Sequence, residues 1–130
     1  MPYLLDAATL AEVLRSVPSR ALVRRLTTIP TRDRWTSVIA VSQLLIAARR
    51  TNQARLMQDV VRLVAAVKVA PFDVLAAQAF AKFRATVSTQ GDPDDAMLAA
   101  IAVTNDFTLV TRRTEEFAKY PHLRVEDWIA

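Results

Sequence analysis

The chain has 130 residues, a net charge of +4 and a hydrophobic content of 52%. This length predicts a single domain, 1–130, with a sizeable core, and no apolar run reaches the ~18 residues that cross a bilayer. Cysteine is absent, which excludes disulfides, thiolate metal sites and cysteine nucleophiles. The N-terminus lacks the basic lead of a secretory signal, so we expect a cytoplasmic protein with no membrane partner.

The charge is unevenly distributed along the chain. Residues 1–68 hold eleven basic and four acidic side chains, whereas residues 69–130 hold six basic and nine acidic ones. Arginine supplies 14 of the 17 basic residues, and its planar fork suits bidentate pairing with phosphate or carboxylate. Two interpretations stay open: a solvated arginine-rich surface, or a surface for an anionic partner such as nucleic acid or an acidic protein segment.

The first half of the chain predicts short strands that alternate with helices. Tyr3–Leu5 is an apolar run followed by Asp6 and a helix-prone segment, which is typical of a buried strand feeding a helix. Pro18 is well placed to begin a second helix. Residues 35–37 have strand chemistry, and Ser37 can cap the helix that follows. Thr51 or Asn52 is expected to cap the next helix.

The second half continues the same alternation. Residues 67–69 form the next predicted strand, Asp73 caps a long helix, and Gly91 is expected to terminate it. A further helix opens at Asp94 and Asp95, and the strands 108–111 and 123–125 follow. Strands alternating with helices indicate a three-layer α/β/α fold with a central parallel sheet of four to five short strands.

Acidic residues therefore follow predicted strands or open predicted helices. In an α/β sheet, ligands gather where strands end and helices begin. Acids at such places either cap a helix or hold a metal ion. The sequence by itself leaves both roles open for Asp6, while Asp95 has the better case for a functional role.

Four segments resemble the PIN-domain family, and in particular its VapC-like toxin branch. They are, in chain order, MPYLLDAATLAEVLR, PFDVLAAQAFAKFRATV, DAMLAAIAVTNDFTLVTRRTEEF and PHLRVEDW. The resemblance covers nearly the whole chain. It implies a PIN-type fold and a metal-dependent ribonuclease, in which carboxylates hold Mg²⁺ or Mn²⁺ and the metal activates water. It also implies a cognate antitoxin, RNA as substrate and a homodimer.

The match at the family's acidic positions is uneven. Asp6 and Asp95 stand at the first and third positions, as expected catalytic and metal-binding residues. Glu116 is a possible supplementary metal ligand. The second position, normally a Glu, is Ala40, and a further Glu of the pattern is Gln43. Asp92 and Asp94 are weaker substitutes for the missing ligands.

The fourth acidic position is the one that departs most from the family. Arg113 stands where the family normally has Asp or Asn. Its guanidinium is expected to pair with Asp6 or Asp95 and to supply a fixed internal charge in place of a metal. Arg112 and Arg113 are also candidate nucleic-acid contacts.

Other chemistries find little support in this sequence. His122 is the only histidine, and one histidine without cysteine is a poor metal site. Ser37 and Ser42 have no partner constellation for serine hydrolysis, and a chain with one glycine lacks a glycine-rich nucleotide loop.

Three functions follow as hypotheses. The first is a PIN-fold protein with a depleted metal site that retains binding of RNA or a protein partner. The second is an active Mg²⁺- or Mn²⁺-dependent endoribonuclease toxin of a type II toxin–antitoxin pair. The third is a structural dimer partner whose helices, not its acids, carry its role.

Overall fold

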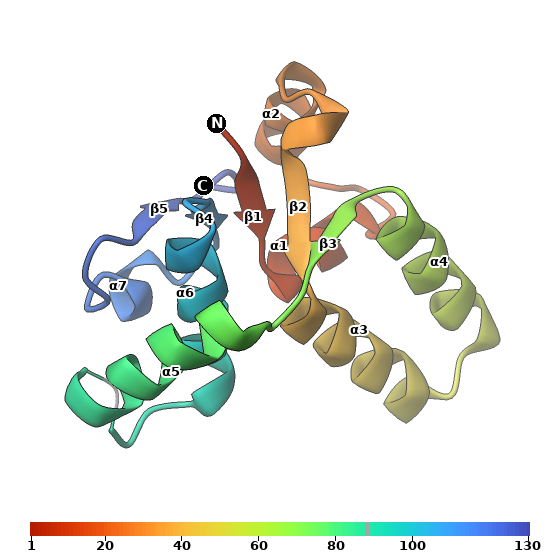
Figure 1. Ribbon diagram of the computed structural model, residues 1–130. Helices are drawn as coiled ribbons and strands as arrows, with labels where there is room; N and C mark the ends of the chain where they lie inside the picture. Colours follow the sequence, from red (N-terminus) through yellow and green to blue (C-terminus); the bar gives the residue numbers. More distant parts are fainter. Residues whose placement is uncertain (88) are drawn as a thin grey trace.

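The computed structural model describes residues 1–87 and 89–130. Its centre is a parallel sheet in the order β3-β2-β1-β4-β5, shown in Figure 1. The strands are β1 (Tyr3–Leu5), β2 (Arg34–Ser37), β3 (Lys68–Ala70), β4 (Thr108–Val110) and β5 (Arg124–Glu126). The expected fold class, α/β with a central parallel sheet, is confirmed.

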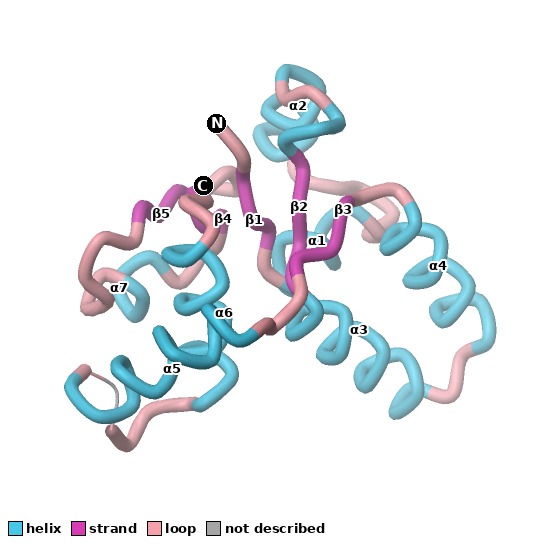
Figure 2. Tube along the Cα trace, in the orientation of Figure 1, coloured by secondary structure: helices cyan, strands magenta, loops and turns pink. Residues whose placement is uncertain are grey.

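Helices connect these strands, as Figure 2 shows. They are α1 (Ala7–Val13), α2 (Arg20–Thr28), α3 (Val38–Thr51), α4 (Ala54–Ala65), α5 (Val74–Thr86), α6 (Pro93–Thr104) and α7 (Thr114–Phe117), with a 3-10 turn at Thr31–Asp33. None of the helices in the described part of the chain has the length and apolar character needed to cross a membrane.

Two cores lie on the two faces of the sheet, because neighbouring side chains of a strand point to opposite faces. Leu4 and Leu109 pack with α5, α6 and α7 in one core. Leu5 and Val110 pack with α1, α2, α3 and α4 in the other. This arrangement makes the protein a three-layer α/β/α structure.

Several predicted helix ends are confirmed by side-chain caps. Ser37 Oγ accepts from Ala40 N at 3.0 Å, and Asp73 Oδ1 accepts from Ala76 N at 3.0 Å. The second helix begins at Arg20, not at Pro18, because Ser19 caps it by accepting from Leu22 N.

Two other predicted ends are wrong. Asn52 ends α3 in the left-handed conformation (φ 52°), which asparagine tolerates, and Gln53 precedes α4 without a side-chain cap. Gly91 does not terminate α5, which ends at Thr86. Instead, the Gly91 carbonyl accepts from Arg84 Nη1 at 2.7 Å, so Gly91 lies beside the last turn of α5.

Candidate functional site

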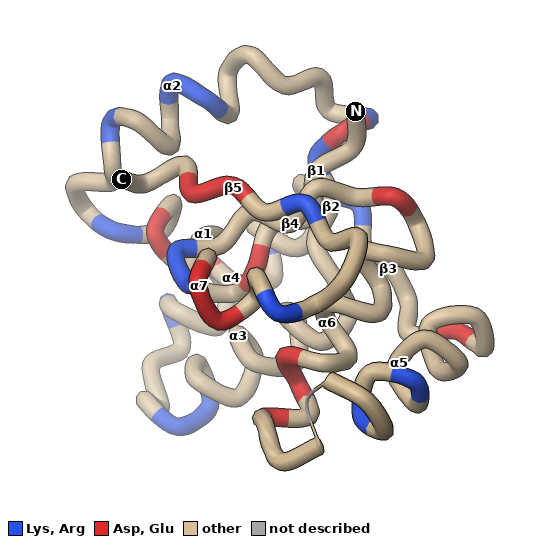
Figure 3. The backbone as a smooth tube through the Cα atoms, turned by 90° about the vertical axis from the view of Figure 1, so that its left-hand side faces the viewer, with Lys and Arg blue, Asp and Glu red and all other residues tan. Residues whose placement is uncertain are grey.

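The candidate site lies at the edge of the sheet where β1, β2 and β4 end. All strands are parallel, so their carboxyl ends share this edge with the first turns of α1, α3 and α6. Figure 3 shows acidic segments (red) at the start of α6 and on α7, with basic segments (blue) close to them. The predicted site residues come from these elements.

Asp6 joins β1 to α1 and is only 5% exposed. Its Oδ1 accepts from Thr9 N at 2.8 Å, so the carboxylate caps α1. Its backbone N–H donates to Val110 O of β4, which ties the start of the helix to the neighbouring strand. The structural role that the sequence left open for Asp6 is therefore present.

The start of α3 carries no acid on the side that faces α6. Ala40 is 2% exposed and offers only a methyl group. One turn later on the same helix face, Gln43 donates from Nε2 to Asp94 Oδ2 at 3.1 Å. The sequence marked Gln43 as a replaced Glu but did not reveal this bond, which depends on how α3 and α6 pack.

Asp95 is held by Arg113, as expected from the sequence. Arg113 Nη2 donates to Asp95 Oδ1 at 2.6 Å and Nη1 donates to Asp95 Oδ2 at 3.0 Å, a bidentate pair. The Asp95 side chain is 18% exposed and that of Arg113 is 47% exposed. Glu116 Oε2 lies 3.4 Å from the same Nη1, so two of the predicted metal ligands contact one guanidinium.

The charge of Arg113 is stabilised by its surroundings. The hydrogen bonds to Asp95 raise the pKa of Arg113 most, partial burial opposes them, and the charges of Asp95, Glu116 and Asp6 raise it further. Arg113 also lies over the Phe117 ring, 5.1 Å from its centroid. The three acids named as metal ligands in the sequence thus act on the same cation.

The acids do not form the metal-ligand set that the resemblance implies. Among the described residues, no three His, Asp or Glu side chains are grouped so that they could hold a metal ion. Asp92, a candidate substitute, accepts from Asp94 N at 2.9 Å and caps α6. Magnesium needs several oxygen ligands in near-octahedral geometry, and this arrangement does not fit it.

One buried acid near the site escaped the sequence analysis. Glu12 of α1 is 8% exposed, and its carboxylate accepts from Arg15 Nη1 at 3.1 Å and from Ser19 N at 2.9 Å. The hydrogen bond from Arg15 lowers the pKa of Glu12 most, and the charge of Arg112 also lowers it. The (i, i+3) spacing of Glu12 and Arg15 was the available signal.

This fold and this edge define the class: a three-layer α/β protein with acidic residues at the carboxyl edge of a parallel sheet. The model of the PIN domain family matches residues 3–123, so the chain belongs to the PIN-domain family.

Its relatives include bacterial toxins. Toxin FitB of Neisseria gonorrhoeae is 30% identical over 125 residues, covering 88% of this chain and 89% of that protein. The tRNA(fMet)-specific endonuclease VapC of Salmonella typhimurium is 25% identical over 132 residues, covering 98% of each chain.

Similar solved structures are toxin–antitoxin complexes. The crystal structure of DNA-bound VapBC from Salmonella typhimurium matches with a TM-score of 0.89 and 25% identity over 98% of both chains. The FitAcB crystal structure from Neisseria gonorrhoeae matches with a TM-score of 0.78 and 26% identity over 96% of both chains. The expected VapC-like resemblance is confirmed.

Proposed function

We propose that this chain is a VapC-like partner protein of a toxin–antitoxin pair that binds RNA or protein and has little or no divalent-metal-dependent nuclease activity. The observation that carries the proposal is the state of the acidic edge. An alanine methyl group stands at the second acidic position, and the third acid is engaged by Arg113.

The chemistry of the missing groups supports this reading. A metal nuclease needs carboxylates to place the ion and its activated water. Ala40 cannot bind a cation, and the charge of Arg113 would repel a metal ion beside Asp95. Glu116 of α7 contacts the same guanidinium, and Asp6, which precedes α1, uses one carboxylate oxygen to cap that helix.

A cleavage assay with metal titration tests the proposal. The purified chain should cleave RNA very weakly or not at all in Mg²⁺ or Mn²⁺, and Asp95→Asn should change little. Robust metal-dependent cleavage that Asp95→Asn abolishes would refute the proposal and favour the alternative, an active Mg²⁺- or Mn²⁺-dependent endoribonuclease toxin.

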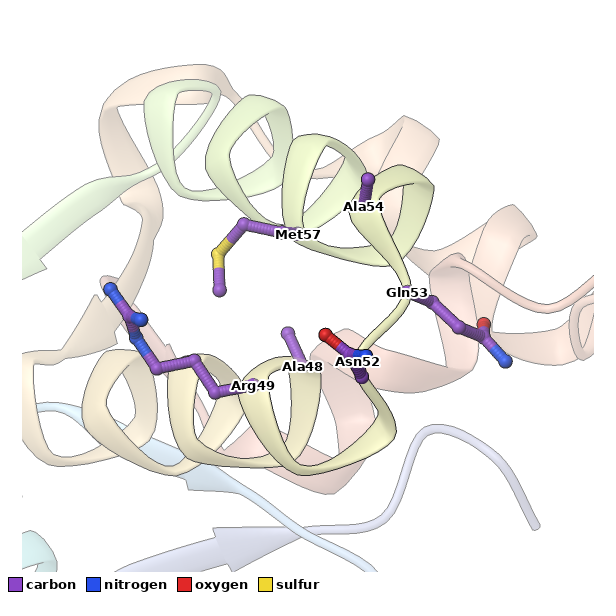
Figure 4. Close-up of a pocket in the computed structure, with 6 residues that line it drawn as sticks. All are labelled: Ala48, Arg49, Asn52, Gln53, Ala54 and Met57. Atoms are coloured by element: carbon purple, nitrogen blue, oxygen red, sulfur yellow. The ribbon is translucent and has the colours of Figure 1, made fainter.

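For the protein partner we propose an antitoxin that binds the groove between α1, α3 and α4. The groove is about 280 Å³ in volume, and it is lined by Ala11, Leu14, Arg15, Leu44, Ala47, Ala48, Leu56 and Val60. Ala48 also lines an adjacent pocket of about 260 Å³ at the α3–α4 turn, with Arg49 on its rim and Met57 opposite (Figure 4). An apolar floor with Arg15 and Arg49 at its margin suits an amphipathic segment with acidic flanks.

The antitoxin proposal is tested by co-expression with a neighbouring small gene product. Ala47→Glu, which places a charge at an exposed residue that lines the groove, should weaken the complex at least tenfold in a pull-down or calorimetric assay. Val61→Glu, on the exposed side of α4, is the matched control and should bind normally. Equal binding by both variants would show that the antitoxin does not bind this groove.

A homodimer remains a proposal, and the exposed side of α3 and α5 is its best surface. Val38 and Ile46 of α3 are 38% and 49% exposed, and Val74 and Leu75 of α5 are 72% and 61% exposed. The two helices start close together, because Ser37 and Ala70 are partners in the β2–β3 register. Apolar residues lie on all sides of α5, as in a helix that is covered.

A second copy of the chain would cover these exposed apolar residues, since each partner in a standard interface buries ~800 Å². Leu75→Glu should therefore give a monomer in analytical ultracentrifugation, and Val61→Glu should not.

RNA is the proposed nucleic-acid ligand, with Arg112 as its contact. Arg112 is exposed just after β4, whereas Arg113 is engaged with Asp95. Arg112→Gln should weaken RNA binding and flatten its salt dependence. A cytoplasmic location stays a prediction.

A further inference from the structure

Arg113 contacts acids of two helices, and the charge of a third acid also acts on it. Asp95 begins α6, Glu116 belongs to α7, and Asp6 joins β1 to α1. Asp95 and Glu116 contact the guanidinium directly, and the charge of Asp6 acts on it from the end of β1. The resemblance predicts a metal ion among these acids, and the structure has a protein cation there.

The position of this cation is determined by more than its ion pairs. The Arg113 backbone N–H donates to Thr111 Oγ1 at 3.1 Å, and its carbonyl accepts from Phe117 N at 3.3 Å. Its guanidinium rests on the ring of Phe117, which is fully buried. The backbone of Arg113 is thus anchored at its N–H and its carbonyl, and this places the guanidinium beside the two acids.

We propose that Arg113 is the resident counter-cation of the acidic edge: its guanidinium fills the place of a divalent ion, ties α7 to α6, and thereby keeps metal ions out. This inference rests on the proposed function and names what regulates that same site. Arg113 is a positioning residue here, since it acts through Asp95 and Glu116.

The proposal has a consequence that an ordinary surface ion pair would lack. When the guanidinium is removed, Asp95 and Glu116 lose the cation that both contact, and their negative charges are no longer offset. A divalent ion then gains access to the carboxylates of Asp95 and Glu116 and loses the repulsion from Arg113. The variant should therefore respond to a metal that the natural chain ignores.

The test compares Arg113→Gln with Arg112→Gln, which removes the same charge at the adjacent residue. Each full-length protein is titrated with Mn²⁺ in a calorimeter and melted with and without 10 mM Mn²⁺. Arg113→Gln should bind Mn²⁺ and gain about 3 °C or more in melting temperature. The natural chain and Arg112→Gln should do neither, and adding Asp95→Asn to Arg113→Gln should abolish the response.

One further variant tests whether the charge of residue 113 is enough to exclude the metal. Arg113→Lys keeps the charge but loses the fork, so it should remain indifferent to Mn²⁺. If Arg113→Gln is unfolded without metal, refolding by Mn²⁺ supports the proposal. An Arg113→Gln chain that stays unfolded in Mn²⁺, or that folds and ignores Mn²⁺ as the natural chain does, overturns it.

This result is separable from that of the proposed function. Metal-dependent RNA cleavage by the natural chain contradicts the proposed function whatever the variants do. An unresponsive Arg113→Gln variant contradicts only the counter-cation role, and it leaves the loss of nuclease activity resting on Ala40.

Discussion

Two arginine–carboxylate pairs in this protein show how differently the same chemistry can be used. Arg113 makes a bidentate pair with Asp95, whose side chain is 18% exposed. Arg25 of α2 makes a single 3.3 Å contact with Glu126 of β5, and both side chains are more than 40% exposed. The first pair uses the full fork of the guanidinium, and the second does not.

The second pair gains its order from aromatic side chains. The Arg25 guanidinium lies 5.1 Å from the ring centroid of Trp128 and 5.7 Å from that of Tyr3. Trp128 Nε1 also donates to Glu126 Oε1 at 2.9 Å. The Arg113–Asp95 pair is therefore mainly an electrostatic interaction at the edge of the sheet. The Arg25 side chain instead attaches α2 mainly by packing against Tyr3 and Trp128.

The largest expected effect is on Mn²⁺ binding, when the positive charge of Arg113 is replaced by a negative one. Ala40→Glu combined with Arg113→Asp adds two carboxylates to the edge, so this double variant should bind Mn²⁺ much more tightly than the natural chain in a calorimetric titration. Ala40→Glu alone, which keeps Arg113, is the control and should bind at least tenfold more weakly. No binding by the double variant would mean that the edge has changed beyond these two positions.

Breaking the first pair should also cost stability. Arg113→Ala should lower the free energy of unfolding by about 1 kcal/mol, since charged hydrogen bonds are lost but half the side chain is in water. Urea denaturation in low salt measures this effect, and Arg112→Ala should leave the midpoint almost unchanged. Equal midpoints for both variants would show that the bidentate pair is energetically silent.

Breaking the second pair should give a smaller, packing-dominated effect. Arg25→Ala should destabilise the chain by about 0.5–1 kcal/mol, from the lost cation–π contacts and the lost cover over Tyr3 and Trp128. Arg25→Met should recover much of this loss, because it keeps an unbranched apolar stem. If Arg25→Met is as unstable as Arg25→Ala, charge and not packing holds α2.

A third pair, Glu12 with Arg15, gives the smallest effect and a pH signature. The pKa of Glu12 is lowered from 4.5 by the Arg15 hydrogen bond, so its stabilising contribution is present above about pH 4.5 and is lost as the pH falls through the folded-state value. Glu12→Gln should therefore be less stable than the natural chain at pH 7, and the two urea midpoints should approach each other as the pH falls below 4.5. A gap that is constant with pH would contradict this origin.

Local sequence signals predicted much of the fold because short-range interactions decide them. Ser37 and Asp73 were identified as caps from their residue types and positions, and both cap helices. The prediction that Gly91 terminates α5 was wrong, because the helix ends at Thr86, five residues earlier. Gly91 instead accepts a hydrogen bond from Arg84 of the same helix, so the identity of this glycine did not by itself place the helix end.

The sequence by itself determined the residue types at the acidic edge: two acids at the expected positions, an alanine that cannot bind metal, and an arginine in place of an acid. Only the tertiary structure decided which acid receives the arginine, since Asp6 and Asp95 were both plausible. One carboxylate oxygen of Asp6 accepts a hydrogen bond from the Thr9 N–H. Asp95, in the first turn of α6, accepts hydrogen bonds from the Arg113 guanidinium with both oxygens. The physical reason is that a helix cap is a local interaction, here between residues three positions apart. The Arg113–Asp95 pair instead forms only when the fold brings together residues 18 positions apart.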